Sequence, residues 1–186
     1  VVTAAHCLCG VNSAPNVILA NGSTSVKPAK AYKNPSCVFS CNQDGPNRCD
    51  VAVLEFAENV LPVGVPLPLY TLQDEKDKAM QIMGYGKQGQ ASSFVGKPKK
   101  CANADGDGQF RVASNVVGST PNNQNGGVIR YSLTNIPGEG MAQDGDSGSP
   151  LVLTKDGQRF IAGVCPLLLF FLPSLSFPVV PYFDQR

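Results

Sequence analysis

The chain has 186 residues, of which 42% are apolar and 16% are charged, and its formal net charge is +1. This length fits one domain or two small units that share a core, and the apolar content excludes a largely disordered chain. With 15 basic and 14 acidic residues, the charge gives no support for nucleic-acid binding. The 19 Gly and 15 Pro favour short strands joined by loops over long helices.

Apolar runs bounded by turn-forming residues predict a series of short strands. In chain order these runs cover residues 17–20, 51–56, 81–86, 127–133, 150–153 and 160–164. The run at 51–56 is almost wholly apolar, which predicts a strand buried on both faces, and Asp156-Gly157 predicts a hairpin turn between the last two runs. Only Thr71 to Met80 has a helix-like composition, and the polar stretch 89–125 is expected to be mostly loop. The chain is therefore predicted to be all-β with long loops.

Seven cysteines are present, and no pair has the C-x₂-C spacing of a structural zinc site. Disulfide bonds explain most of them better than metal binding does, and disulfides imply secretion because they persist in oxidising compartments. The sequon Asn21-Gly22-Ser23 fits the same route. The odd number of cysteines leaves at least one thiol without a partner in this chain.

The segment from Val164 to Phe183 carries no charged residue and reaches the length of about 20 residues that a membrane-spanning helix needs. Four prolines interrupt it, and each interior proline removes a helix hydrogen bond and clashes with the preceding turn. We therefore expect residues 165–186 to form an apolar tail outside the fold. A membrane anchor is the minor alternative, and detergent-dependent solubility would reveal it.

Two residues carry the signals of general-base chemistry. His6, in Thr3-Ala4-Ala5-His6-Cys7, is the only histidine of the chain. An isolated histidine is often structural, but imidazole is the side chain that titrates near neutral pH, so His6 is the candidate base. Asp50 precedes the apolar run at 51–56. There it is either a turn residue or a carboxylate that accepts a hydrogen bond from an imidazole N–H.

A third candidate is Ser147, in Gly145-Asp146-Ser147-Gly148-Ser149-Pro150. Loops of this composition are often only turns, as we expect for residues 105–108. A serine next to glycine differs because its hydroxyl stays exposed and nearby backbone N–H groups can turn inward as an oxyanion hole. The segment is not the G-x-S-x-G elbow, since Ser149 stands where the last glycine belongs.

In this order, TAAHC, DVAVL and GDSGSP resemble the chymotrypsin/trypsin-like serine endopeptidase family. The resemblance extends over residues 1–164 and implies two packed six-stranded β-barrels with the site between them. In this chain the first barrel would lack its N-terminal strands, and the second its C-terminal strands and helix. The resemblance implies that His6 is the general base, that Asp50 orients it, and that Ser147 is the nucleophile. The backbone N–H groups of Gly145 and Ser147 would hold the oxyanion.

Further family features concern specificity and loop order. The residue six before the nucleophile forms the base of the primary pocket, and the matching Met141 offers no charge to Arg or Lys, so the resemblance implies a preference for uncharged side chains. A shift of one or two residues would place Asp144 there instead. Gly84-Tyr85-Gly86 resembles the family's G-W-G segment. Asp146 matches the aspartate that pairs with a free N-terminal amine in the family, and neither that amine nor the usual partner of Cys7 has a counterpart in this chain.

The sequence therefore predicts a secreted serine endopeptidase that hydrolyses peptide bonds of proteins or peptides through an acyl-enzyme. We expect a monomer that needs no cofactor or metal, binds no nucleic acid and does not enter membranes. The chain as given, without the strands named above, is expected to be inactive. The alternative is a non-catalytic homologue that binds a partner protein, although a binding module has no physical need for all three catalytic groups.

Overall fold

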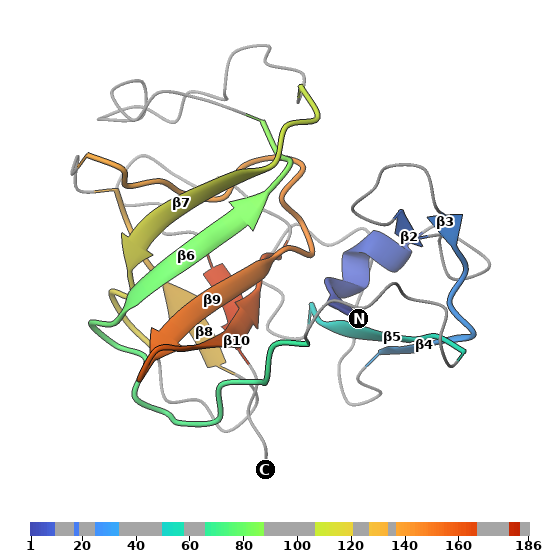
Figure 1. Cartoon of the computed structure of the whole chain (residues 1–186), viewed down its shortest axis with the longest axis horizontal. Coiled ribbons are helices and arrows are strands. Elements are labelled where there is room, and N and C mark those ends of the chain that lie inside the picture. Colours follow the sequence, from blue (N-terminus) through green and yellow to red (C-terminus); the bar gives the residue numbers. More distant parts are fainter. Residues whose placement is uncertain are drawn as a thin grey trace.

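The computed structural model describes residues 1–9, 17–18, 25–33, 50–57, 66–87, 107–120, 127–133, 137–166 and 179–182. These residues form two antiparallel β units that lie side by side (Figure 1). The first unit contains β1 (Val2–Thr3), the 3₁₀ helix η1 (Ala5–Leu8), β2 (Val17–Ile18), β3 (Ser25–Val26), β4 (Lys30–Lys33) and β5 (Ala52–Glu55). The second contains β6 (Ala79–Gly84), β7 (Arg111–Val116), β8 (Gly127–Arg130), β9 (Pro150–Lys155), β10 (Gln158–Val164) and β11 (Val179–Tyr182). The prediction of an all-β fold is confirmed.

In the first unit, β5 lies between β1 and β4, and β2 pairs with β3. Ala52 and Leu54 point into a small core that η1 covers with Ala5 and Leu8. Val53, on the other face of β5, is 43% exposed. The prediction that this strand is buried on both faces is therefore wrong, because only one face has a partner layer in the described residues.

The second unit is a six-stranded sheet in the order β7-β6-β9-β10-β11-β8. A bridge between Ser119, just after β7, and Arg130 of β8 joins the two ends of this order, so the sheet closes into a barrel. Its interior is filled mainly by apolar side chains on the strands or just after them: Met80, Ile82, Val117, Ile129, Tyr131, Leu151, Leu153 and Ala162.

The hairpin between β9 and β10 turns where the sequence predicts. Lys155 pairs with Gln158, and the two residues between them, Asp156 and Gly157, have φ values of 50° and 76°. Two consecutive residues with positive φ make the type I′ turn that matches the twist of antiparallel strands, and Asp-Gly is favoured there.

Two segments differ from the sequence-based expectation. β7 lies inside the stretch expected to be mostly loop, and it pairs with β6 over six residues. Residues 71–78 form turns and irregular backbone instead of a helix, and Asp77 has a φ of 64°. That left-handed conformation redirects the chain into β6, so a helix cannot continue through it.

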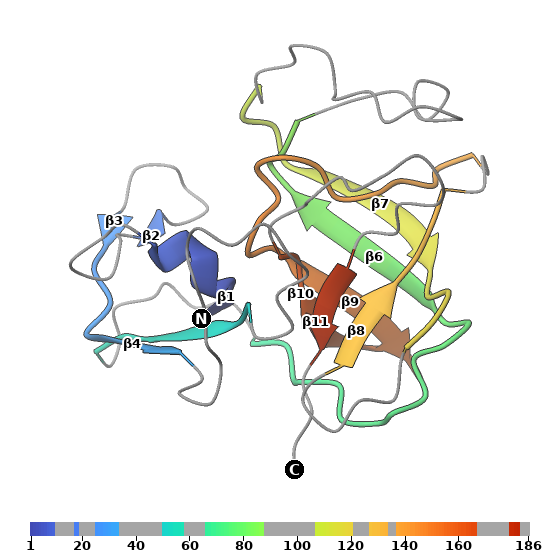
Figure 2. The same ribbon diagram turned by 180° about the vertical axis from the view of Figure 1, so that it is seen from behind.

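The apolar tail contributes β11, which pairs with β8 from Val179↔Arg130 to Tyr182↔Gly127 and with β10 at Gly163↔Tyr182 (Figure 2). This strand belongs to residues 165–186, the segment that we expected to lie outside the fold. No helix in the described residues is long and apolar enough to cross a membrane.

Candidate active site

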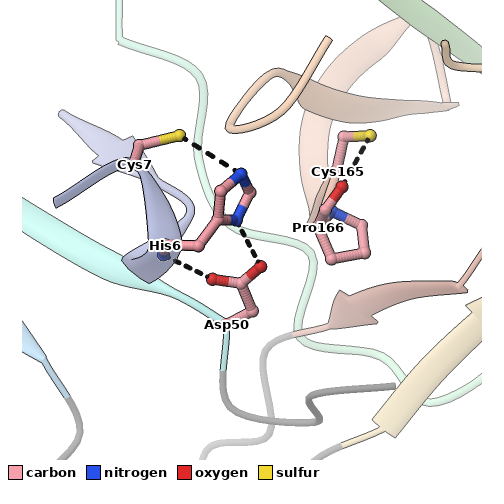
Figure 3. Close-up of polar contacts among 5 residues, drawn as sticks. All are labelled: His6, Cys7, Asp50, Cys165 and Pro166. Atoms are coloured by element: carbon pink, nitrogen blue, oxygen red, sulfur yellow. Dashed lines mark hydrogen bonds and ion pairs between the residues drawn. The ribbon is translucent and has the colours of Figure 1, made fainter. Parts of the chain in front are cut away.

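His6 and Asp50 are brought together by the pairing of β1 with β5. Val2 pairs with Val53 and Thr3 with Ala52, so η1, which follows β1, lies beside the start of β5. The His6 Nδ1 atom is 2.6 Å from Asp50 Oδ2, and the His6 backbone N–H donates to Asp50 Oδ1 at 2.8 Å (Figure 3). Asp50 is buried, and each of its two carboxylate oxygens contacts His6.

The electrostatics of His6 favour its protonated form. Burial acts to lower the pKa of His6, but the hydrogen bond with Asp50 and the contact with Cys7 raise it to about 9. Cys7 Sγ lies 3.8 Å from His6 Nε2, the nitrogen that does not face Asp50. At neutral pH the imidazole therefore carries a proton and forms an ion pair with Asp50.

Ser147 lies between two turns, and the backbone hydrogen bonds of these turns do not use the N–H groups of Gly145 and Ser147. The N–H of Asp146 donates to the Gln143 carbonyl at 2.9 Å, and that of Ser149 donates to the Asp146 carbonyl at 3.0 Å. Gly145 and Gly148 adopt φ values of 93° and 82°, which make these turns possible. Among the described residues, the N–H groups of Gly145 and Ser147 donate to no backbone carbonyl.

The serine loop lies against the segment that carries His6. The Gly148 N–H donates to the carbonyl of Cys165, the residue that follows β10. On its other side, Gly148 faces the His6 segment: a Cβ added to Gly148 would overlap Thr3 Oγ1 and lie 3.4 Å from Cys7 Sγ. The His6–Asp50 pair and the loop that contains Ser147 thus lie at the contact of the two units. Within the described part of the chain, no hydrogen bond joins His6 Nε2 to the Ser147 hydroxyl.

Asp146 has backbone partners that the sequence analysis did not find. Its Oδ1 accepts from the Gly86 N–H and its Oδ2 from the Gln143 N–H, both at 2.8 Å. The signal available in the sequence was the spacing of Gly84 and Gly86, because glycines in a strand often mark the close approach of another group.

The two residues expected near a substrate pocket lie in different surroundings. Met141 lines a cavity of about 250 Å³ together with Ile82, Ala113 and Asp146. Asp144 is exposed, with its carboxylate 3.7 Å from Lys87 Nζ, and does not line that cavity.

The cysteines of the described residues are of two kinds. Cys9 is disulfide-bonded, whereas Cys7 and Cys165 are free thiols. Burial raises the pKa of the Cys165 thiol, so it stays protonated at neutral pH. In the part of the chain searched, no three His, Cys, Asp or Glu side chains gather as metal ligands.

Two antiparallel β units, with a His–Asp pair in one and a glycine-flanked serine loop in the other, define the class of trypsin-like serine proteases. The family model described as Trypsin matches residues 1–166, and the chain belongs to that family. A solved structure of mouse neuropsin, "a serine protease expressed in the limbic system", is similar with a TM-score of 0.66. The two sequences are 17% identical, and the match covers 97% of this chain and 78% of that one, so the likeness is one of fold.

Proposed function

We propose that this protein is a serine endopeptidase that hydrolyses peptide bonds through an acyl-enzyme. The observation that carries the proposal is the His6–Asp50 pair, joined at 2.6 Å, with the Ser147 loop packed against the segment that holds His6. A nucleophile beside a base that is oriented by a third group is the arrangement that acyl transfer requires.

In this mechanism the Ser147 hydroxyl attacks the peptide carbonyl carbon, and its proton passes to Nε2 of neutral His6. Asp50 then stabilises the imidazolium, and the Gly145 and Ser147 N–H groups donate to the oxyanion. When the intermediate collapses, the imidazolium gives its proton to the leaving amine. Water, activated by His6, then releases the acyl group and regenerates Ser147. The two N–H groups suit this role because no backbone carbonyl in the described residues accepts from them.

We further propose that the primary pocket takes uncharged, apolar side chains. Met141 matches the family's pocket base, and a thioether gives no counter-charge to a buried guanidinium. The exposed position of Asp144 beside Lys87 supports this, since its charge is paired at the surface. Cleavage of peptide libraries should be strongest after Leu or Phe, and strong cleavage after Arg would contradict the assignment.

We also propose that the protein is secreted, acts as a monomer on protein or peptide substrates, and needs no cofactor. Family membership and the disulfide-bonded Cys9 support the secretory route. None of the groups in the mechanism above calls for a metal or an organic cofactor.

The second candidate function is that of a non-catalytic homologue that binds a partner protein. The contact of His6 Nε2 with Cys7 favours it, because a protonated imidazole cannot accept the proton of Ser147. In this alternative, the same loops would form a binding surface and Ser147 would not be activated.

Labelling with a fluorophosphonate distinguishes the two candidates. The secreted full-length protein should be labelled at Ser147 at pH 8–9, and heat denaturation before the reagent is added should prevent labelling. Ser147→Ala should remove the label and lower kcat by several orders of magnitude, and His6→Ala should cost about as much because the groups act as a unit. A folded protein that resists labelling, or a Ser147→Ala variant with normal peptidase activity, contradicts the proposal.

A further inference from the structure

Two glycines enclose the carboxylate of Asp146. A Cβ added to Gly84, the last residue of β6, would overlap Oδ1 and lie 2.9 Å from Cγ of Asp146. A Cβ added to Gly86 would lie 2.5 Å from that Cγ and 2.6 Å from both oxygens. The space that alanine side chains would need at these two positions is thus already occupied by one carboxylate. We call Gly84 and Gly86 the glycine cradle.

The backbone itself does not require glycine at either position. The positive-φ glycines of the described residues are Gly108, Gly138, Gly145, Gly148 and Gly157. Because Gly84 and Gly86 are not among them, alanine could adopt their backbone conformation without the strain of the left-handed region. The need for glycine therefore comes from the Asp146 side chain.

The carboxylate links the serine loop to the end of β6. It accepts one N–H from Gly86 in the cradle and one from Gln143 in the loop. The Lys87 N–H donates to the Asp144 carbonyl at 2.8 Å and makes a second link between the same two segments. Asp146 directly precedes Ser147, so a displaced Asp146 also displaces the Ser147 N–H and hydroxyl.

We propose that Gly84 and Gly86 are positioning residues, which act by leaving room for Asp146 and so fix the geometry of the loop that carries Ser147. The structural part of this proposal stands by itself, and its catalytic consequence rests on the proposed function. A displacement of about 1 Å at a reacting group costs on the order of 100-fold in rate. The cradle therefore acts on catalysis through the position of Asp146.

The test compares Gly84→Ala with Tyr85→Ala in the full chain. Tyr85 lies between the two glycines, is 54% exposed and packs on Phe110, so its removal leaves the cradle intact. Gly84→Ala should increase amide hydrogen exchange in residues 143–149 and lower kcat by about 100-fold while KM changes by less than about threefold. Tyr85→Ala should change neither quantity.

A double variant separates the carboxylate clash from a general loss of structure. Asp146→Ala empties the cradle, so adding Gly84→Ala to Asp146→Ala should have no further effect on exchange or on kcat. If Gly84→Ala alone does not fold, the double variant should fold as well as Asp146→Ala does. Additive losses, a double variant that does not fold, or an unchanged serine loop in Gly84→Ala each overturn the proposal.

Hydrogen exchange also keeps the two proposals distinguishable. If the wild-type protein is folded but inactive, the proposed function fails while the exchange of residues 143–149 still tests the cradle. Loosening of that loop in Gly84→Ala, and not in Tyr85→Ala, would then support the cradle alone.

Discussion

The protonation of His6 depends on two neighbouring side chains, Asp50 and Cys7. Asp50 and Cys7 both raise the pKa of the imidazole, against the effect of burial, and the result is about 9. For a general base this value is high, since only the neutral form can accept the serine proton. The ionic state of His6 is therefore a property of the contacts around it as much as of the histidine itself.

The pH dependence of catalysis should show the raised pKa of His6. We expect kcat/KM to increase with pH, with an apparent pKa near 9, because His6 must lose its proton before it can act as a base. We call this increase the alkaline limb of the pH profile. Cys7→Ala removes one of the groups that raise the pKa of His6 and should move the limb to lower pH. Cys165→Ala, which changes a thiol without contact to His6 Nε2, serves as the control. A limb that stays in place in Cys7→Ala would contradict the role given to that contact.

Glu75 is a second residue at which burial opposes the charged form of the side chain. It is 1% exposed, and its Oε1 has no hydrogen-bond partner among the described residues. Burial raises the pKa of the Glu75 carboxyl, so the folded state favours the neutral form. Stability should then fall as pH rises from the ordinary carboxyl range through this raised pKa.

Glu75→Gln should therefore raise Tm at pH 7 by a few degrees and change it little at pH 4. The substitution keeps the shape of the side chain and removes the charge. Thermal unfolding followed by circular dichroism at the two pH values measures both effects. A loss of stability that is larger at pH 7 than at pH 4 would mean that partners in the fold stabilise the carboxylate, and it would contradict this prediction.

At the scale of the elements, β11 determines whether the second sheet is a closed barrel. It lies between β10 and β8, and without it both strands would expose unpaired backbone N–H and C=O groups. The sequence predicted a tail outside the fold, whereas part of the tail forms β11. The four prolines of the tail argue against a helix, but they do not show whether a strand forms, because strand pairing depends on partners far away in the sequence.

Truncation tests this role directly. A chain that ends after Pro166 should melt at a clearly lower temperature, with faster hydrogen exchange in β8, while a chain that ends after Tyr182 keeps β11 and should melt like the full chain. If the shorter chain keeps the full melting temperature, the tail lies outside the cooperative fold, as the sequence alone suggested.

Local signals were readable from the sequence, and most long-range contacts were not. The hairpin at Asp156-Gly157 follows from backbone conformation at two residues. The His6–Asp50 pair joins two segments far apart in the sequence, and it was expected because the two motifs resemble those of a known family. β7 escaped prediction because polar residues such as Ser114 and Asn115 interrupt its apolar pattern, and its pairing with β6 supplies the missing stabilisation. The partners of Asp146 escaped because they depend on the close approach of Gly86, far away in sequence.

At the scale of the whole molecule, the candidate site lies on the contact between two units of unequal size. In the described residues, the core of the first unit contains Ala5, Leu8, Ala52 and Leu54, and that of the second is a larger cluster around β6, β9 and β10. Because apolar burial supplies most of the stability, the smaller unit should open first. Opening it removes His6 and Asp50 from Ser147.

Urea should therefore abolish function before it unfolds the barrel. We expect fluorophosphonate labelling of Ser147 to be lost at a lower urea concentration than the hydrogen-exchange protection of β9 and β10. The two measurements can be made on the same samples. Coincident midpoints would indicate a single cooperative unit and contradict this order of events.

The position of β11 also has a consequence for the time order of folding during synthesis. Val179 pairs with Arg130, so β8 leaves the ribosome long before the strand that covers its edge. Until then, β8 and β10 are both open edges, and a nascent chain in this state can pair with another copy of itself. We therefore expect slow translation of the segment between β10 and β11 to increase the yield of misassembled chains, which gel filtration of the product would measure.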